Sequence, residues 1–357
     1  MFIRFRIFLT SFLLFAHITQ AAAPASDKIV VAHRGASGYL PEHTLEAKVL
    51  AHAMGADYIE SDVLMTSDNA LVVLHDLYID QNTDVAEVYP GRARDDGRFY
   101  VIDFTLDELR QLRVSERSRR QNGTAQPVYP DRFPLNSGGF GIHTLQEEIE
   151  LIQGLNKTLG REAGIYVEIK RPWFHHQEGK DQAAAILQVL KEYGYESKDD
   201  KVFLQTFDFN ELKRVREELM PVLGMDIMLA QLIANNEGME TFELVNGQWL
   251  PYDYNWMHTE EGIQELARYA NGIGPAMDMI VSNESTQDKL LISSLVDFAH
   301  AADMVVHPYT FRRDAGLVPD YAESFERLLE IFYFEADVDG LKTDFPDAAL
   351  RLIQERE

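Results

Sequence analysis

The residues of this chain best suited to chemistry are two histidines, three carboxylates, an arginine and a lysine in four short polar clusters. Each cluster follows or closes an apolar run of the kind that forms a β-strand. Polar groups at the carboxyl ends of parallel strands are where α/β enzymes place their reactive side chains. The groups present here indicate metal-assisted cleavage of a phosphodiester. The four clusters are His33-Arg34-Gly35, Glu60-Ser61-Asp62, His75-Asp76 and Glu168-Ile169-Lys170.

Three of the carboxylates form a predicted metal site. Glu60 and Asp62 are two residues apart on a strand, so both side chains point to the same face and repel each other unless a cation lies between them. Glu168 ends the strand that we expect next around the sheet. Three carboxylates in a chain without cysteine suit a hard cation, Ca²⁺ or Mg²⁺. For Glu60 and Asp62 alone, a pair of solvated acids is the simpler interpretation, and Glu168 reverses that preference.

His33 and His75 are the predicted acid/base pair. An imidazole can accept or donate a proton near neutral pH, as cleavage of a P–O bond requires of a base and an acid. Arg34 and Lys170 supply the cationic donors that a phosphate needs. Which histidine is the base stays open, as does the choice between direct attack by water and a cyclic phosphate intermediate.

These clusters need a scaffold of alternating strands and helices. Helices are predicted at 44–54, 183–193 and 210–219, and eight strands suit a closed (β/α)8 TIM barrel better than an open doubly wound sheet. A ninth, short strand is expected at 71–74. An insertion subdomain after the second strand, at about 84–141, contains a helix capped by Thr105 with Glu108 in the capping-box position. The eight strands are predicted at 29–32, 56–59, 164–167, 201–204, 222–225, 279–281, 304–306 and 338–341.

The N-terminus predicts export. Residues 1–21 have basic residues, a short apolar run and a small-residue end, which is typical of a cleaved signal peptide, and residues 27–349 then form one barrel domain. The apolar run is shorter than the ~20 residues of a membrane-spanning helix, so no stable membrane insertion is expected. The formal net charge of -25 argues against nucleic acid or an anionic membrane as a partner.

The motifs together resemble the signature of glycerophosphodiester phosphodiesterases. The run at 33–44, HRGASGYLPEHT, contains the first cluster, and the run at 172–181, PWFHHQEGKD, is similar to the exported, periplasmic branch of that family. The similarity continues through 205–208, 307–310 and 343–347. It covers nearly the whole mature chain, and the joint pattern is much more specific than any single tripeptide.

The resemblance implies a TIM barrel that hydrolyses glycerophosphodiesters, such as glycerophosphocholine and glycerophosphoethanolamine, to an alcohol and sn-glycerol 3-phosphate. It implies one divalent cation, with Ca²⁺ expected and Mg²⁺ the alternative. Trp173, Tyr309 and Arg312 would line the pocket or serve packing. The residues carried over by position are His33 and His75 for acid/base catalysis, Glu60, Asp62 and Glu168 for the metal, Arg34 and Lys170 for phosphate, and Gln205 and Phe207 for the glycerol side.

Lys342 departs from the family pattern, because relatives usually carry an apolar or aromatic residue there. If its side chain faces the mouth of the barrel, it adds positive charge and could change substrate preference. If it faces the helices, it must extend outward to water. The sequence leaves both orientations open.

The sequence therefore predicts an exported, periplasmic, metal-dependent phosphodiesterase with a small-molecule substrate. One alternative is an enzyme acting on lysophospholipid, which would need an exposed apolar rim or an interfacial helix. The other is a non-catalytic binding protein on the same scaffold, since a fold alone does not give a function. The presence of all seven expected catalytic, metal and phosphate groups favours the enzyme. The oligomeric state is not predicted.

Overall fold

The computed structural model describes residues 28–121 and 124–356. The predicted signal peptide, residues 1–21, lies outside these described residues. Within them, no helix combines the length and the apolar character needed to cross a membrane.

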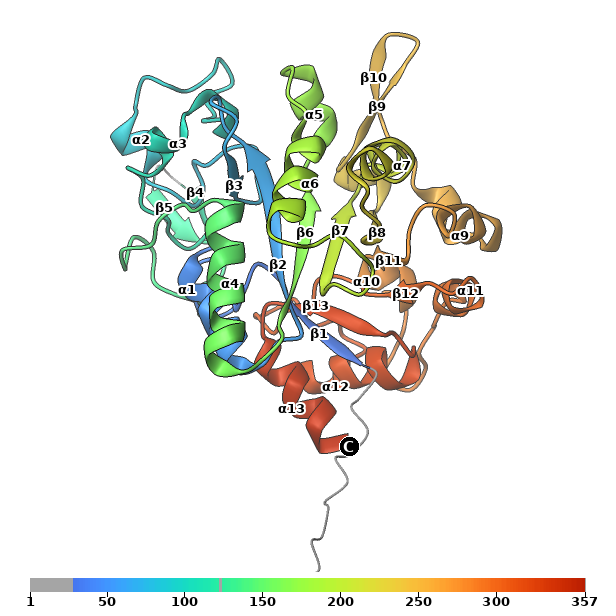
Figure 1. The fold of residues 1–357 in the computed structure, drawn as a ribbon. Helices are drawn as coiled ribbons and strands as arrows, with labels where there is room; N and C mark the ends of the chain where they lie inside the picture. The colour runs from blue at the N-terminus through green and yellow to red at the C-terminus, as the bar shows by residue number, and fades with distance from the viewer. Residues whose placement is uncertain (1–27, 122–123, 357) are drawn as a thin grey trace, which may run out of the picture.

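Eight parallel strands wind into a barrel (Figure 1), in the order β12-β11-β8-β7-β6-β2-β1-β13. After β12 the chain closes the barrel against β13, where the Lys342 N–H donates to the Pro308 carbonyl at 3.0 Å and the Phe311 N–H donates to the Lys342 carbonyl at 2.9 Å. The predicted TIM barrel is therefore confirmed. The strands are β1 (Ile29–Ala32), β2 (Tyr58–Met65), β6 (Gly164–Ile169), β7 (Val202–Thr206), β8 (Met228–Ile233), β11 (Gly272–Pro275), β12 (Val305–Val306) and β13 (Gly340–Thr343).

Helices surround the strands, and the main apolar core lies between the two layers. The predicted helices are present, and the one expected at 210–219 is α7 followed by a π-helical segment, Val215–Leu219. A second π-helical segment, Ile331–Glu335, follows α12. The outer helices are α1 (Leu45–Met54), α4 (Leu145–Leu159), α6 (Gln182–Glu192), α7 (Phe209–Arg214), α8 (Met220–Leu223), α9 (Glu260–Leu266), α11 (Leu295–Ala301), α12 (Phe325–Glu330) and α13 (Pro346–Arg356).

The chain between β2 and α4 forms the predicted insertion subdomain. Its strand β3 (Leu71–Val73) pairs antiparallel with the end of β2. An apolar cluster of its own, which includes Phe99, Phe104 and Leu112, packs against that hairpin. The predicted capping box of Thr105 and Glu108 begins a short helix, α3. The other elements are α2 (Val85–Val88), the 3-10 turn Val101–Asp103, α3 (Leu106–Leu109), β4 (Ser118–Gln121) and β5 (Thr124–Pro127).

Two strand predictions are wrong. Residues 222–225 belong to the end of α8 and its cap, where Gly224 adopts a φ of 68° and ends the helix, and the strand follows as β8. Residues 279–281 overlap the short helix α10 (Met277–Ile280), and the strand precedes it as β11. Glycines occupy two of the four β11 positions, which weakens the sequence signal for a strand, but pairing with β8 and β12 stabilises it.

The strand ends also differ from the prediction. Glu60 and Asp62 lie inside β2, and Glu168 lies inside β6, because the two strands stay paired as far as Val63 and Ile169. The carboxylates are therefore held by regular strand backbone. His33 directly follows β1, as predicted.

Further short elements lie at the carboxyl end of the barrel. The hairpin of β9 (Phe242–Val245) and β10 (Gln248–Pro251) projects from this end (Figure 1). It exposes Leu244, Trp249 and Leu250, of which Leu244 is 59% exposed. The remaining short elements are α5 (Pro172–Gln177) and the 3-10 turns Asn236–Gly238 and Asn255–His258.

Helix α4 offers a test of local stability. The Thr144 hydroxyl accepts from the Glu147 N–H at 3.2 Å, and the Glu147 carboxylate accepts from the Thr144 N–H at 2.9 Å. Thr144→Ala should lower the free energy of unfolding by about 1 kcal/mol, because it leaves the Glu147 N–H without this acceptor. Denaturant titration followed by circular dichroism measures the change. Thr158→Ala, at an exposed position of the same helix, is the control. Equal decreases in the free energy of unfolding in the two variants would contradict a stabilising role of the Thr144 cap.

Candidate active site

Alternation along three neighbouring strands builds the site in layers. Strands β2, β6 and β7 turn every second side chain into the barrel. At the amino end these positions are aromatic, and Tyr166 and Phe203 stack with ring centroids 4.7 Å apart beside Tyr58. The aromatic layer closes the lower barrel, so the space above it opens only toward the carboxyl ends. The inward side chains above this layer are Glu60 and Asp62 on β2, Glu168 and Lys170 on and after β6, and Gln205 and Phe207 on and after β7.

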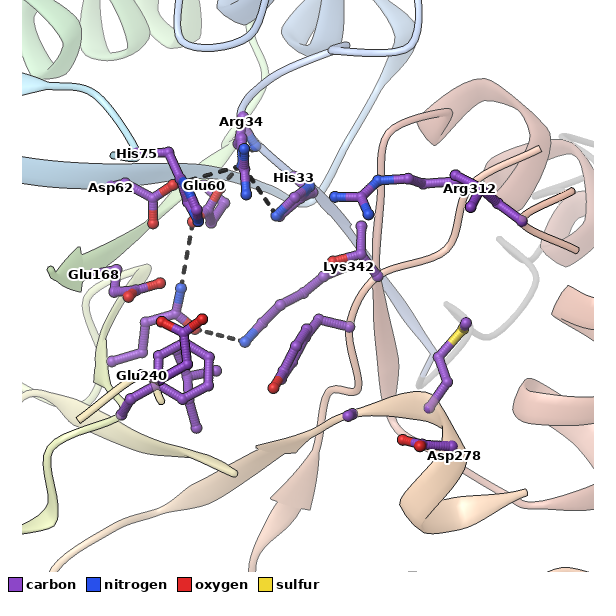
Figure 2. A pocket seen from close by; sticks show the side chains of 18 of the residues that line it. His33, Arg34, Glu60, Asp62, His75, Glu168, Glu240, Asp278, Arg312 and Lys342 are labelled. Atoms are coloured by element: carbon purple, nitrogen blue, oxygen red, sulfur yellow. Dashed lines mark hydrogen bonds and ion pairs between the residues drawn. The ribbon is translucent and has the colours of Figure 1, made fainter. Parts of the chain in front are cut away.

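A cavity of about 570 Å³ occupies this upper space (Figure 2). Tyr309 and Arg312 line it too, whereas Trp173 is not among the described residues of its wall; its indole N–H donates to the Glu240 carbonyl at 3.3 Å. Nine side chains singled out from the sequence meet in this one cavity, although they are spread over about half of the barrel sequence. They are His33, Arg34, Glu60, Asp62, His75, Glu168, Lys170, Gln205 and Phe207.

The carboxylate cluster is buried and crowded. Glu60 and Asp62 are each 1% exposed, and Asp62 lies beside Glu168 in the register of β2 with β6. Burial, and then the charge of Asp62, raises the pKa of Glu60. Burial also raises the pKa of Glu168 well above its usual range. Without a cation, some of these acids must hold protons, which a bound metal ion would replace.

Two sets of side chains at this cluster are candidate ligands of a metal ion: Glu60 and Asp62 with either His43 or Glu168. Ligand atoms of His43, Glu60 and Asp62 lie within 4.8 Å of one another. His43, however, is behind the cavity wall, with Nε2 2.8 Å from Asp62 Oδ2 and Nδ1 3.4 Å from the Lys48 ammonium. Glu168 faces the cavity, and its Oε1 accepts no hydrogen bond from the part of the chain that the structure describes, although the Lys170 ammonium is 3.0 Å away. The ligand atoms that lie close enough to hold one ion are thus those of His43, Glu60 and Asp62, while the predicted ligand Glu168 pairs with Asp62 in the strand register and faces the cavity.

His33 is held by a carboxylate from the far end of the chain. Its Nδ1–H donates to Asp344 Oδ1 at 2.6 Å, and Asp344 Oδ2 accepts from Arg132 at 2.6 Å and from Arg312 at 2.9 Å. Although burial opposes it, the charge of Arg312 and the bond from His33 hold the pKa of Asp344 well below its usual range. Burial lowers the pKa of His33 to about 3. His33 is therefore neutral at pH 7, and its Nε2 accepts from Arg34 Nε at 3.3 Å.

His75 is held in the same way. Its Nδ1–H donates to Asp76 Oδ1 at 2.5 Å, and the Arg117 guanidinium donates to Asp76 Oδ2. The other terminal nitrogen of the Arg117 guanidinium donates to Glu42 Oε1 at 2.5 Å. The second oxygen of Glu42, Oε2, accepts from Arg34 at 2.9 Å. Burial lowers the pKa of His75 to about 3, so this imidazole is also neutral at pH 7. In each histidine the bond from Nδ1–H to an aspartate fixes the tautomer and leaves Nε2 unprotonated, and in His33 that nitrogen accepts from Arg34.

The two predicted phosphate-binding cations border the carboxylates. The Arg34 N–H donates to Glu60 Oε2 at 2.7 Å, and the Arg34 side chain lies 3.6 Å from Asp62 Oδ2. Arg34 has a φ of 60°, in the left-handed region. Lys170 pairs with Glu168 and lies 5.4 Å from the Phe207 ring centroid. Both cations are therefore placed where an anionic ligand would meet them.

Lys342 points into the barrel, which answers the question that the sequence left open. It is 1% exposed, and its ammonium donates to Gln205 Oε1 at 2.5 Å (Figure 2). The ammonium lines the same cavity as the nine predicted residues.

Sequence reasoning missed the residues that hold the reactive ones. Asp76 and Asp344 stand in recognised motifs, but nothing in the sequence indicated that they orient histidines. Arg117 and Arg132 lie in the insertion, among other arginines, so no local signal distinguished them. Their partners are 41 and 212 residues away in the chain. Only the folded arrangement brings these arginines to the aspartates that hold His75 and His33.

Comparisons with known proteins agree with this architecture. The profile of the Glycerophosphoryl diester phosphodiesterase family matches residues 33–348. A glycerophosphodiester phosphodiesterase of Haemophilus influenzae is 49% identical over 92% of this chain and 90% of its own length. One of Treponema pallidum is 45% identical over 93% of each chain.

A likeness in structure supports the fold. The structure of an Oleispira antarctica phosphodiesterase in complex with the product sn-glycerol-3-phosphate covers 91% of this chain and 96% of its own, with a TM-score of 0.56 and 21% identity. At that identity the likeness bears on the fold alone. The family match and the two relatives are decisive: the chain belongs to the glycerophosphoryl diester phosphodiesterase family.

Proposed function

We propose that this protein hydrolyses glycerophosphodiesters, such as glycerophosphocholine and glycerophosphoethanolamine, to an alcohol and sn-glycerol 3-phosphate. The observation that carries the proposal is the pairing of two neutral, carboxylate-anchored histidines with a buried three-carboxylate cluster in one cavity. The relatives of 49% and 45% identity bear the name of this activity. The structure of the Oleispira antarctica phosphodiesterase with sn-glycerol-3-phosphate shows such a product in a barrel of the same fold.

A divalent cation fits the acidic side of the cavity, with Ca²⁺ expected and Mg²⁺ the alternative. Glu60, Asp62 and Glu168 would hold it, since oxygen donors suit a hard cation and Glu168 Oε1 has no hydrogen bond from the described residues. The ion would supply Lewis-acid stabilisation of a phosphate oxygen. His43 would keep Asp62 oriented through its 2.8 Å hydrogen bond.

The chain's own residues supply binding and proton transfer. Arg34 and Lys170 would bind the remaining phosphate oxygens, and Gln205 and Phe207 would border the glycerol side. One neutral histidine would accept the proton of the attacking hydroxyl or water through Nε2. The other would have to carry a proton on Nε2 when the substrate is bound, and it would give that proton to the leaving alkoxide. The attached aspartate would stabilise each imidazolium form. The role of each histidine depends on which side of the phosphate the alcohol occupies.

We further propose that the protein acts in the periplasm. The support is the N-terminal sequence, residues 1–21, which has the basic, apolar and small-residue regions of a cleaved signal peptide.

A second candidate substrate is lysophospholipid, and the β9–β10 hairpin favours it. Leu244, Trp249 and Leu250 are exposed on this hairpin, at the carboxyl end of the barrel where the cavity opens. An exposed apolar rim near the mouth is the feature that a lipid substrate would require. The acidic cavity beneath it suits the diester part of either substrate equally.

The substrate and metal assay is the direct test of this proposal. The chelator-treated protein should release sn-glycerol 3-phosphate from glycerophosphocholine only after Ca²⁺ or Mg²⁺ is added, because the buried carboxylates otherwise repel the phosphate. Lysophosphatidylcholine is the parallel substrate, with release of lysophosphatidic acid and choline measured by coupled assay and mass spectrometry. Full activity in excess EDTA would contradict the metal site. Turnover of lysophosphatidylcholine without turnover of glycerophosphocholine would show that the substrate is a lysophospholipid and not a glycerophosphodiester.

The histidines should be individually essential. His33→Gln and His75→Gln should each lower kcat by at least about 10²-fold, since each removes one proton-transfer group. His300→Gln is the matched control, because the His300 ring is far from the cavity lining and its Nε2 lies 3.0 Å from Asp339 Oδ2. An unchanged kcat in His33→Gln would remove His33 from the catalytic pair.

Arg117 should affect kcat through the two carboxylates that its guanidinium group binds. Arg117→Leu leaves the carboxylates of Asp76 and Glu42 without their guanidinium partner, so His75 and Arg34 lose their fixed orientation. We expect kcat to fall about 10-fold or more. Arg120→Leu, an exposed site on β4 of the same hairpin, should leave kcat unchanged. A similar loss in both variants would indicate a general effect on the insertion.

A further inference from the structure

Lys342 is a buried cation that the proposed reaction does not use. Its side chain enters the cavity from β13, and Gln205 Oε1 is its hydrogen-bond acceptor among the described residues. An ammonium group carries three donors, so the single 2.5 Å bond leaves it incompletely satisfied. Such a group needs nearby negative charge to remain charged inside a protein.

The barrel makes room for this ammonium. A Cβ atom at Gly274 on β11 would lie 2.8 Å from Lys342 Nζ, closer than atoms in contact can approach. The ring centroid of Tyr166, in the aromatic layer below, is 4.8 Å from Nζ. The ammonium is therefore confined between Gly274, Tyr166 and Gln205, and its position at the base of the cavity is fixed.

The negative charge that faces Lys342 is the carboxylate cluster. The charges of Glu60, Glu168 and Asp62, in that order, favour the ammonium form, while burial lowers the pKa of Lys342 to about 8. Gln205 links the two sides directly, because its amide N–H donates to Glu60 Oε1 at 3.5 Å while its Oε1 accepts from Lys342. Figure 2 shows Lys342 reaching into the cavity that Glu60, Asp62 and Glu168 also line.

We propose that the Lys342 ammonium is a built-in counter-cation of the carboxylate cluster, which competes electrostatically with the divalent cation and thereby sets how tightly the site binds it. Lys342 lines the cavity together with Arg34, Lys170 and the three carboxylates, so the carboxylates have cationic neighbours before any metal ion enters. A divalent ion must then bind against the repulsion of a fixed positive charge. This inference rests on the proposed metal site and concerns its affinity.

The test is the affinity of the full chain for Ca²⁺ and Mg²⁺, measured without substrate by isothermal titration calorimetry at pH 7. Lys342→Met keeps the length of the side chain and removes the charge, and it should bind the cation roughly tenfold tighter than the unaltered protein. Lys342→Gln, a neutral variant that retains hydrogen-bonding groups, should do the same and serves if Lys342→Met does not fold. Lys201→Met is the control, because it removes an exposed ammonium at the amino end of β7 and should leave the affinity unchanged.

The outcomes separate this inference from the proposed function. Tighter binding in both neutral Lys342 variants, with Lys201→Met unchanged, supports the counter-cation. Equal or weaker binding in the Lys342 variants overturns it and leaves the metal site intact. Binding by none of the proteins overturns the metal site as well. Tighter cation binding by Lys201→Met as well would show that the net charge of the protein, rather than the position of Lys342, controls the affinity, and it would overturn the inference.

Discussion

The burial of like charges inside a closed barrel is the constraint on which the site depends. Glu60, Asp62 and Glu168 are held by regular strand backbone with almost no access to water. Each ionised carboxylate there costs free energy unless a cation or a proton compensates it. The surroundings supply cations on every side, with Arg34 and Lys170 at the wall and Lys342 at the base. In the proposed function a metal ion would complete this compensation, and Arg34 and Lys170 would then bind a phosphate.

The need for fixed geometry explains the rest of the architecture. Two neutral imidazoles are useful for proton transfer only if their tautomers are set, and Asp344 and Asp76 set them. Each aspartate is in turn held by an arginine of the insertion, Arg132 or Arg117. The insertion subdomain is thus a structural part of the active site. Behind the carboxylates, Lys48 pairs with Glu148 at 3.0 Å and donates to the Glu60 carbonyl, which supports β2 from the outside.

Local patterns in the sequence predicted much of this. The alternation of Glu60 with Asp62 and of Glu168 with Lys170 placed all four side chains on the inner face, and the fold follows from eight strand-and-helix units. The misplaced strands mark where local signals fail. β11 is half glycine and depends on its neighbours, and Val222 is apolar yet 86% exposed at the end of a helix. Arg117 and Arg132 could not be identified, because ion pairs between distant segments leave no trace in one sequence. The orientation of Lys342 needed the register of β13 and the space at Gly274.

The measurement that tests the central claim most directly is anomalous diffraction from crystals of the protein soaked in Mn²⁺, a stand-in for the hard cation. The account predicts one strong peak within about 2.5 Å of oxygens from Glu60, Asp62 and Glu168. His43 should remain hydrogen-bonded to Asp62 behind it. A peak ligated by His43 in place of Glu168, or no peak at the carboxylates, would contradict the account.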